Sequence, residues 1–169
     1  NDPVASIISV GRISLLLLPW LSYGLVRQIG CSPASAIVAF LLILLDPLLL
    51  GIGVQGLSDA PALCMLATSV WLLAAKRWLC SGLVLGLCIA IRPSYLPILL
   101  PLLAFIPWRN PRSIKPLLYS VFSVGIVCLG FLFSQDGFGY FVEGWRFVIG
   151  HFQTWGNSAV GEPQQIGWP

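Results

Sequence analysis

Six apolar runs, separated by short polar or proline-containing turns, dominate the first 134 residues of this chain. We place the runs at residues 13–26, 34–45 with a kinked continuation over 48–57, 60–75, 79–91, 95–106 and 117–133. In the whole chain 57% of the residues are hydrophobic and 9% are charged, whereas an average soluble domain is about one quarter charged. Because a membrane-spanning helix needs about 20 mostly apolar residues, the pattern predicts an all-α transmembrane bundle of about six helices. Several runs are short, so we expect some helices to be tilted or re-entrant.

The turns between the runs carry recognisable helix boundaries. Ser32 precedes Pro33, which predicts a helix with a serine N-cap and proline at its first position. Asp46-Pro47 should end or kink the same helix, because proline removes a backbone hydrogen bond. Ser58-Asp59 should cap the helix over 60–75.

Small residues recur at four-residue spacing in the run over 79–91. They are Gly82, Gly86 and Ala90. Such a stripe lets a neighbouring helix backbone approach closely, so we expect this run to pack tightly against another helix.

The charged residues predict which face of the membrane each turn occupies. If the six runs alternate from an outer N-terminus, one face receives Arg27, Lys76, Arg77, Arg109, Arg112 and Lys115, and the positive-inside rule makes that face cytoplasmic. The other face receives every acidic residue: Asp2, Asp46, Asp59, Asp136, Glu143 and Glu162. This segregation requires the chain to turn back at Arg92-Pro93. We therefore predict a multi-pass integral membrane protein, of a bacterial inner membrane or its equivalent, whose functional face lies outside the cytoplasm.

The domain organisation follows from a change of composition near residue 135, where the apolar runs give way to mixed glycine, aromatic and polar residues. We predict one membrane domain over 1–169, with transmembrane helices over 1–134 and an outer-face loop over 135–169. In this loop residues 138–155 could form an interfacial amphipathic helix. The chain opens on Asn1-Asp2-Pro3 and its one methionine is Met65, so we expect an internal piece of a longer protein.

Several functional classes find no support in the sequence. There is no run of basic residues interleaved with aromatics, which nucleic-acid binding would need. No Walker loop, HExxH, GxSxG or dinucleotide glycine motif is present. The five cysteines lack metal-ligand spacing, so no metal site is predicted, although outer-face acids leave a divalent cation possible.

Two acidic residues are candidate catalytic groups on the outer face. Asp59 begins a predicted helix beside a glycine-rich turn, and Asp46 opens a turn before Pro47. Each position also has a purely structural explanation. A carboxylate at a helix amino end is favoured by about 0.3–1 kcal/mol through the helix dipole, and aspartate is a common turn residue.

Three arginines on the outer face run against the insertion bias and are candidate binding residues. They are Arg12, Arg92 and Arg146. Each could meet an anionic ligand, or could form an ion pair with an aspartate that only fastens helix ends together.

The only histidine, His151, lies among aromatic residues that include Trp155. Flat aromatic side chains stack on sugar rings, and they also sit at the level of lipid headgroups. His151 and Trp155 are therefore candidate substrate-binding residues, with membrane anchoring as the commoner use.

The order of these motifs resembles the polytopic glycosyltransferases of the GT-C class, which include the protein mannosyltransferases and the bacterial lipid A aminoarabinose transferases. The resemblance covers about residues 4–106 and rests on Arg12, Asp46-Pro47-Leu48, Gly56-Leu57-Ser58-Asp59-Ala60-Pro61, and Ile91-Arg92-Pro93-Ser94. It implies transfer of a sugar from a polyprenyl-phosphate donor at the outer membrane face. By this resemblance Asp59 would shape the polar cavity, and Arg92 or Arg12 would meet the donor phosphate. The acidic catalytic motif of such enzymes usually lies in a loop before the helix that opens this chain, where only Asp2 remains.

Two alternatives stay open at this point. Helices broken at Asp46-Pro47 and Arg92-Pro93 also suit a transporter or channel subunit, although no inverted repeat is visible. A non-catalytic membrane scaffold is the other alternative. The partners that the sequence predicts are a lipid-linked sugar donor and membrane lipids.

Overall fold

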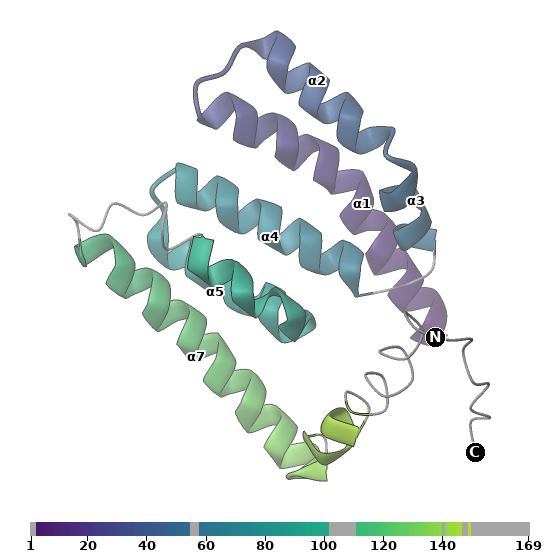
Figure 1. The fold of residues 1–169 in the computed structure, drawn as a ribbon, viewed down its shortest axis with the longest axis vertical. Coiled ribbons are helices and arrows are strands. Elements are labelled where there is room, and N and C mark those ends of the chain that lie inside the picture. The colour runs from purple at the N-terminus through teal and green to yellow at the C-terminus, as the bar shows by residue number, and fades with distance from the viewer. Residues whose placement is uncertain (1–2, 55–57, 102–110, 140, 147–148, 150–169) are drawn as a thin grey trace, which may run out of the picture. The chain divides into compact units, whose positions relative to one another are not determined.

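The computed structural model describes residues 3–54, 58–101, 111–139, 141–146 and 149. The regular elements among these residues are helical, in agreement with the predicted all-α class (Figure 1). They are α1 (Pro3–Gln28), α2 (Pro33–Leu44), α3 (Pro47–Val54), α4 (Asp59–Ala74), α5 (Trp78–Ile91), the 3-10 helix η1 (Pro93–Ile98) and α7 (Pro111–Asp136). The chain forms two compact units, residues 1–126 and 127–169, which divide within α7.

The predicted helix boundaries around α2 and α3 are confirmed. The Ser32 hydroxyl accepts a hydrogen bond from the backbone N–H of Ser35 at 3.1 Å, and Pro33 is the first residue of α2. Asp46 lies between α2 and α3, and its Oδ1 accepts a hydrogen bond from the backbone N–H of Leu48 at 2.9 Å. The proline at position 47 thus begins a helix instead of kinking one, because its missing N–H costs nothing in the first turn.

Helices α4 and α5 form an antiparallel hairpin held by buried polar contacts. Ser69 and Ser81 exchange hydrogen bonds: each hydroxyl donates to the other residue's carbonyl, at 3.0 and 2.8 Å. One turn from the far end of the hairpin, the Cys88 thiol donates to the carbonyl of Ala62 at 3.2 Å. Both serines are 1% exposed, so these bonds join the helices where water does not reach.

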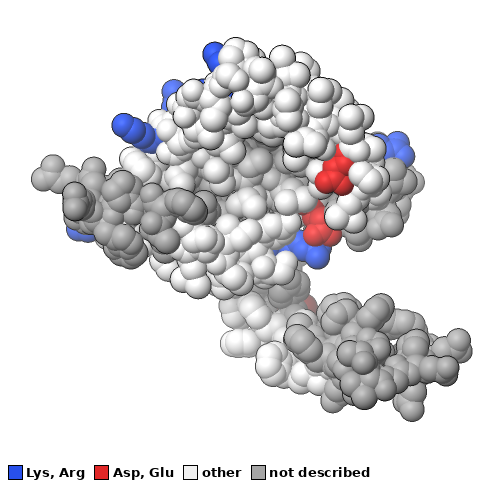
Figure 2. All heavy atoms as spheres, turned by 45° about the horizontal axis from the view of Figure 1, so that its top comes forward, with Lys and Arg blue, Asp and Glu red and all other residues white. Residues whose placement is uncertain are grey.

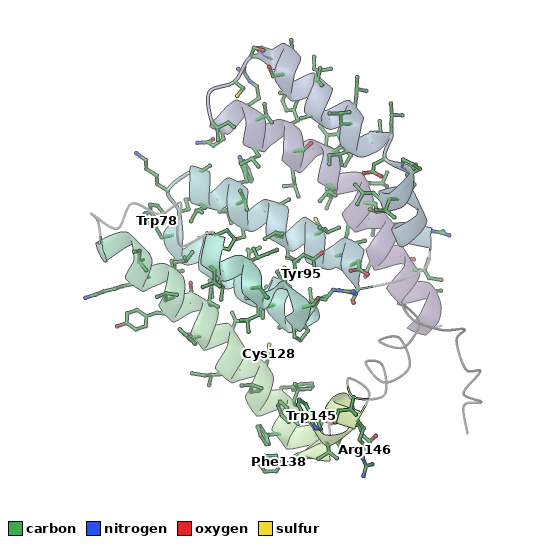
Figure 3. All side chains as sticks on the ribbon, in the orientation of Figure 1. Trp78, Tyr95, Cys128, Phe138, Trp145 and Arg146 are labelled. Carbon is green, nitrogen blue, oxygen red and sulfur yellow. The ribbon has the colours of Figure 1, made fainter. Side chains whose placement is uncertain are left out.

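Helix α7 packs along α5 at the predicted small-residue stripe. A Cβ atom added to Gly82 would overlap the Leu117 carbonyl and the Ser120 hydroxyl, and one added to Gly86 would meet the Val124 Cβ at 2.8 Å. At the start of both helices, Trp78 packs against the buried side chains of Ile114 and Leu117 (Figure 3). The close approach that the glycines predict is therefore confirmed at Gly82 and Gly86.

The order of these contacts fixes the direction of α7. Higher residue numbers in α5 meet higher numbers in α7, so the two helices run parallel. Helix α5 ends at Ile91 and the 3-10 helix η1 begins at Pro93, so the predicted break at Arg92-Pro93 is confirmed.

Many of the buried residues in this fold are small, and many large apolar residues are exposed. Fully or almost fully buried positions include Ala36, Ala60, Ala62 and Ser69, whereas Leu42, Leu45, Leu48 and Ile126 are 69–71% exposed. A soluble protein usually buries most of its large apolar residues, whereas membrane helices associate through small residues while large ones face lipid. The distribution is consistent with a membrane protein.

Within the described residues, two helical stretches are long and apolar enough to cross a membrane, Ile8–Gln28 and Ile114–Asp136, and α2, α4 and α5 are shorter apolar helices. The predicted count of about six transmembrane helices is not confirmed. Both long helices extend beyond the predicted apolar runs. Polar residues such as Ser9 and Lys115 continue the helices without belonging to the apolar pattern that predicted them.

The second unit begins with the last turns of α7. After Asp136 the chain turns at Gly137, whose φ of +58° favours glycine. The rings of Phe138 and Phe141 then pack against Phe133, with ring centroids 5.0 and 5.5 Å apart, and residues 141–146 are helical. Figure 3 shows Phe138, Trp145 and Arg146 around this short segment. The rest of the predicted amphipathic helix over 138–155 lies mostly outside the described residues.

Candidate functional site

The charged side chains of the first unit are divided between its two ends. Helices α1 and α4 begin at one end, where α2 and α5 finish (Figure 1). We call this the acidic end, because it contains Asp46 and Asp59, the described acids of the unit, together with Arg92. The opposite, basic end contains Arg27, Lys76, Arg77 and Lys115. Figure 2 shows acidic side chains beside basic ones in one region, with other basic side chains apart from any acid.

An ion pair between Arg92 and Asp59 lies at the centre of the acidic end. The Arg92 Nη1 donates a hydrogen bond to Asp59 Oδ2 at 2.8 Å, and the side chains are 39% and 19% exposed, respectively. Two hydroxyls complete the contacts: Arg92 Nε donates to Ser94 Oγ at 3.2 Å and Nη1 donates to Ser58 Oγ at 3.4 Å. We call Ser58, Asp59, Arg92 and Ser94 the arginine site.

Local sequence explains why these residues meet. Arg92 precedes a proline, and such residues favour extended backbone; its φ of −144° and ψ of 96° end α5 there. Asp59 is the first residue of α4, where the helix dipole favours a carboxylate. Because α4 and α5 are antiparallel, the amino end of one helix lies beside the carboxyl end of the other.

Ser58 occupies the predicted N-cap position of α4 without performing the predicted function. Its side chain makes no capping hydrogen bond, and its hydroxyl accepts the hydrogen bond from Arg92 instead. The sequence signal for a cap therefore identified a residue of the arginine site.

Tyr95 follows Ser94 in η1 and belongs to the surroundings of this site. Burial raises the pKa of the Tyr95 phenol, and the negative charge of Asp59 raises this pKa further, against a smaller opposing effect of Arg92. A phenol is protonated at neutral pH even without this shift, so Tyr95 can donate a hydrogen bond. Sequence reasoning missed Tyr95, because nothing in the sequence distinguishes it from an interfacial aromatic residue.

Asp46 lies at the acidic end with a different set of contacts. Its Oδ1 accepts hydrogen bonds from the backbone N–H groups of Leu48 and Leu49, at 2.9 and 3.4 Å. This is the geometry of an N-cap residue. The structure thus gives Asp46 the structural role that the sequence left open and does not join it to the arginine site.

Among the other predicted site residues, Arg12 is the one that lies in the described part of the first unit. Arg12 is exposed on α1, and no described residue forms an ion pair with it. Arg146 lies in the second unit, where its Nη1 donates to Glu143 Oε1 at 2.7 Å one helical turn away. His151 and Trp155 lie outside the described residues.

The chemistry available at the arginine site is anion binding. A guanidinium offers five N–H donors in a plane that matches phosphate and carboxylate oxygens. Among the described residues no group of three or more His, Cys, Asp or Glu side chains could hold a metal ion. The donor groups of Arg92 are of the kind that bind anions.

Comparison with known families matches almost the whole chain to one model. The model described as glycosyltransferase family 87 matches residues 3–163, which include every residue of the arginine site. No curated protein and no solved structure matches the chain.

Proposed function

The chain belongs to glycosyltransferase family 87, and we propose that it is the core of a membrane enzyme whose lipid-linked sugar donor binds at the arginine site. In this proposal the donor is a polyprenyl-phosphate sugar, transfer takes place at the membrane face where the acidic end lies, and that face is outside the cytoplasm. Kinship with the protein mannosyltransferases and aminoarabinose transferases is part of the same proposal.

The observation that carries the proposal is the position of Arg92. The charged heads of a phospholipid-like donor stay at headgroup depth while its hydrocarbon chain stays in the bilayer, so a phosphate-binding cation belongs at a helix end. Arg92 lies at such an end, next to the amino terminus of α4. Helix amino termini also favour anions, which supports a phosphate there.

The proposed reaction assigns one role to the arginine site. When the acceptor hydroxyl attacks the anomeric carbon, the bond between that carbon and the phosphate oxygen breaks, and the leaving phosphate takes the electron pair. Arg92 would stabilise the negative charge that grows on this phosphate, as preorganised donors do in other transfer reactions. A base must accept the hydroxyl proton in the same step.

The alternatives from the sequence receive no support of their own. A transporter or channel subunit was suggested by helices that break at Asp46-Pro47 and Arg92-Pro93. Membership in a glycosyltransferase family favours the transferase, and the break at Arg92-Pro93 then serves to end α5 beside Asp59.

Binding of a truncated donor tests the proposal directly. We expect the full-length protein, purified in detergent, to bind farnesyl phosphate at least about tenfold more tightly than farnesol, because a phosphate forms charge-assisted hydrogen bonds with Arg92. The two ligands share one hydrocarbon chain, so the comparison isolates the phosphate. Equal affinities in a fluorescence or calorimetric titration would contradict the proposed donor.

The proposed topology predicts opposite labelling of two exposed positions. Ser94 lies at the acidic end and Cys31 at the basic end, and both are exposed. In single-cysteine variants of intact cells we expect a membrane-impermeant maleimide to label Ser94→Cys and to leave Cys31 unlabelled until the membrane is opened. Labelling of Cys31 first would invert the orientation, and equal labelling of both would argue against a bilayer between the two ends.

A further inference from the structure

We infer that Asp59 is a positioning residue for Arg92 and not the general base of the transfer reaction. This inference rests on the proposed function and refines it, because the sequence had made Asp59 a candidate catalytic acid or base. It also assigns Ser58 and Ser94 to the same task of holding the guanidinium.

The hydrogen bonds of Arg92 use only part of its guanidinium group. Among the described residues, Arg92 donates hydrogen bonds through Nη1 and Nε, and none is donated through Nη2. Asp59 and Ser58 thus hold one corner of the planar group and Ser94 holds a second. The third corner, Nη2, carries two N–H donors, which in this inference meet the anion. An arginine side chain that is fixed before binding loses less conformational entropy when the anion arrives.

The Asp59 carboxylate is occupied by its hydrogen bond with Arg92. A general base needs a lone pair directed at the hydroxyl whose proton it accepts. The Oδ2 of Asp59 accepts a hydrogen bond from Arg92 at 2.8 Å, and the side chain is 19% exposed, so within the described contacts Oδ1 is the oxygen that could accept a proton. A proton accepted at Oδ1 would cancel the negative charge that Arg92 faces in this partly buried place, at the step in which Arg92 must stay in position. The Asp59 carboxylate in this position is therefore suited to holding the orientation of the Arg92 guanidinium.

A purely electrostatic effect of Asp59 and a positioning role predict different changes in phosphate binding when Asp59 is removed. A negative charge beside an anion site repels the anion, so removing Asp59 should by itself strengthen phosphate binding. If Asp59 positions Arg92, removing it should weaken phosphate binding instead, because the guanidinium loses its fixed orientation. The two roles therefore predict effects of opposite sign.

A double-mutant cycle with farnesyl phosphate as the probe tests the inference. In the full-length protein we expect Asp59→Ala to weaken binding about tenfold, which is the loss expected for a charge-assisted hydrogen bond. In an Arg92→Ala background the same change should have no further effect or should tighten binding slightly. Asp59→Asn keeps an oxygen that can accept from Arg92, so it should recover part of the lost affinity.

Turnover of a radiolabelled polyprenyl-phosphate sugar provides the second measurement. For Asp59→Asn we expect a raised KM for the donor, kcat within about threefold of the wild type, and an unchanged acidic limb of the pH profile. Loss of a general base typically lowers kcat by about 100- to 10,000-fold and removes that limb.

The outcomes separate this inference from the proposed function. Wild-type protein that binds farnesyl phosphate no better than farnesol overturns the donor assignment. Wild-type discrimination combined with unchanged or tighter binding by Asp59→Ala overturns only the positioning role. Thermal unfolding of each variant in detergent checks that it is folded, and Asp59→Asn keeps the test decisive if Asp59→Ala does not fold.

Discussion

Replacing Arg92 by alanine in the full-length protein is expected to lower sugar transfer by about 100- to 1,000-fold, the loss seen when one preorganised donor is removed from a developing negative charge. The alternative role of the Arg92–Asp59 pair is to fasten α4 to α5. Because Arg92 is 39% exposed, such an ion pair stabilises the fold by only about 0–1 kcal/mol. A loss of the expected size therefore exceeds what a structural role can produce.

Radiolabelled transfer, measured beside the amount of folded protein in the membrane, checks this result. Arg77→Ala is the matched control, since it removes an exposed arginine from the basic end, and it should retain wild-type transfer. Arg92→Lys keeps the charge but loses the planar fork, so its activity should fall between the two. Near wild-type transfer by Arg92→Ala would show that Arg92 has no role in the transfer reaction.

The second large effect concerns the contact between α5 and α7. We expect Gly82→Ala to destabilise the protein by at least about 1–3 kcal/mol, the usual cost of forcing extra atoms into a packed interior. The added Cβ would overlap the Leu117 carbonyl and the Ser120 hydroxyl. The carbonyl belongs to the α7 backbone, so the clash is relieved only if the whole helix moves.

Gly125→Ala is the control for this change, because an added Cβ there meets no atom within 4 Å. It should leave stability unchanged or raise it by about 0.5–1 kcal/mol, since alanine is the better helix former. Thermal unfolding in detergent measures both variants. Equal stability of the two would mean that α5 and α7 do not approach each other as closely as the structure has them.

Local features of this fold were predictable from the sequence, because short-range chemistry determines them. Ser32 caps α2, Asp46-Pro47 separates α2 from α3, and Arg92-Pro93 ends α5. In each case the residue types restrict their own backbone, whatever surrounds them. The small-residue stripe on α5 likewise predicted that another helix packs closely against it, although the sequence did not show that this helix is α7.

The pairing of Asp59 with Arg92 could be predicted only in part. The charge pattern placed both residues at one membrane face, but 33 positions separate them in the chain. Which residues meet depends on how far α4 and α5 are shifted along each other, and this shift is decided by tertiary packing. The same limitation explains Ser58, whose hydroxyl contacts an arginine that local sequence does not reveal.

The serine pair between α4 and α5 has a consequence at the far end of the hairpin. Ser69 and Ser81 hydrogen-bond each other in only one alignment of the two helices. Each residue adds about 1.5 Å along a helix, so sliding the hairpin by a single residue would separate Arg92 from Asp59 by about that distance and break their hydrogen bond. The hydrogen bonds between these two buried serines thus fix the distance between Arg92 and Asp59, several helical turns away.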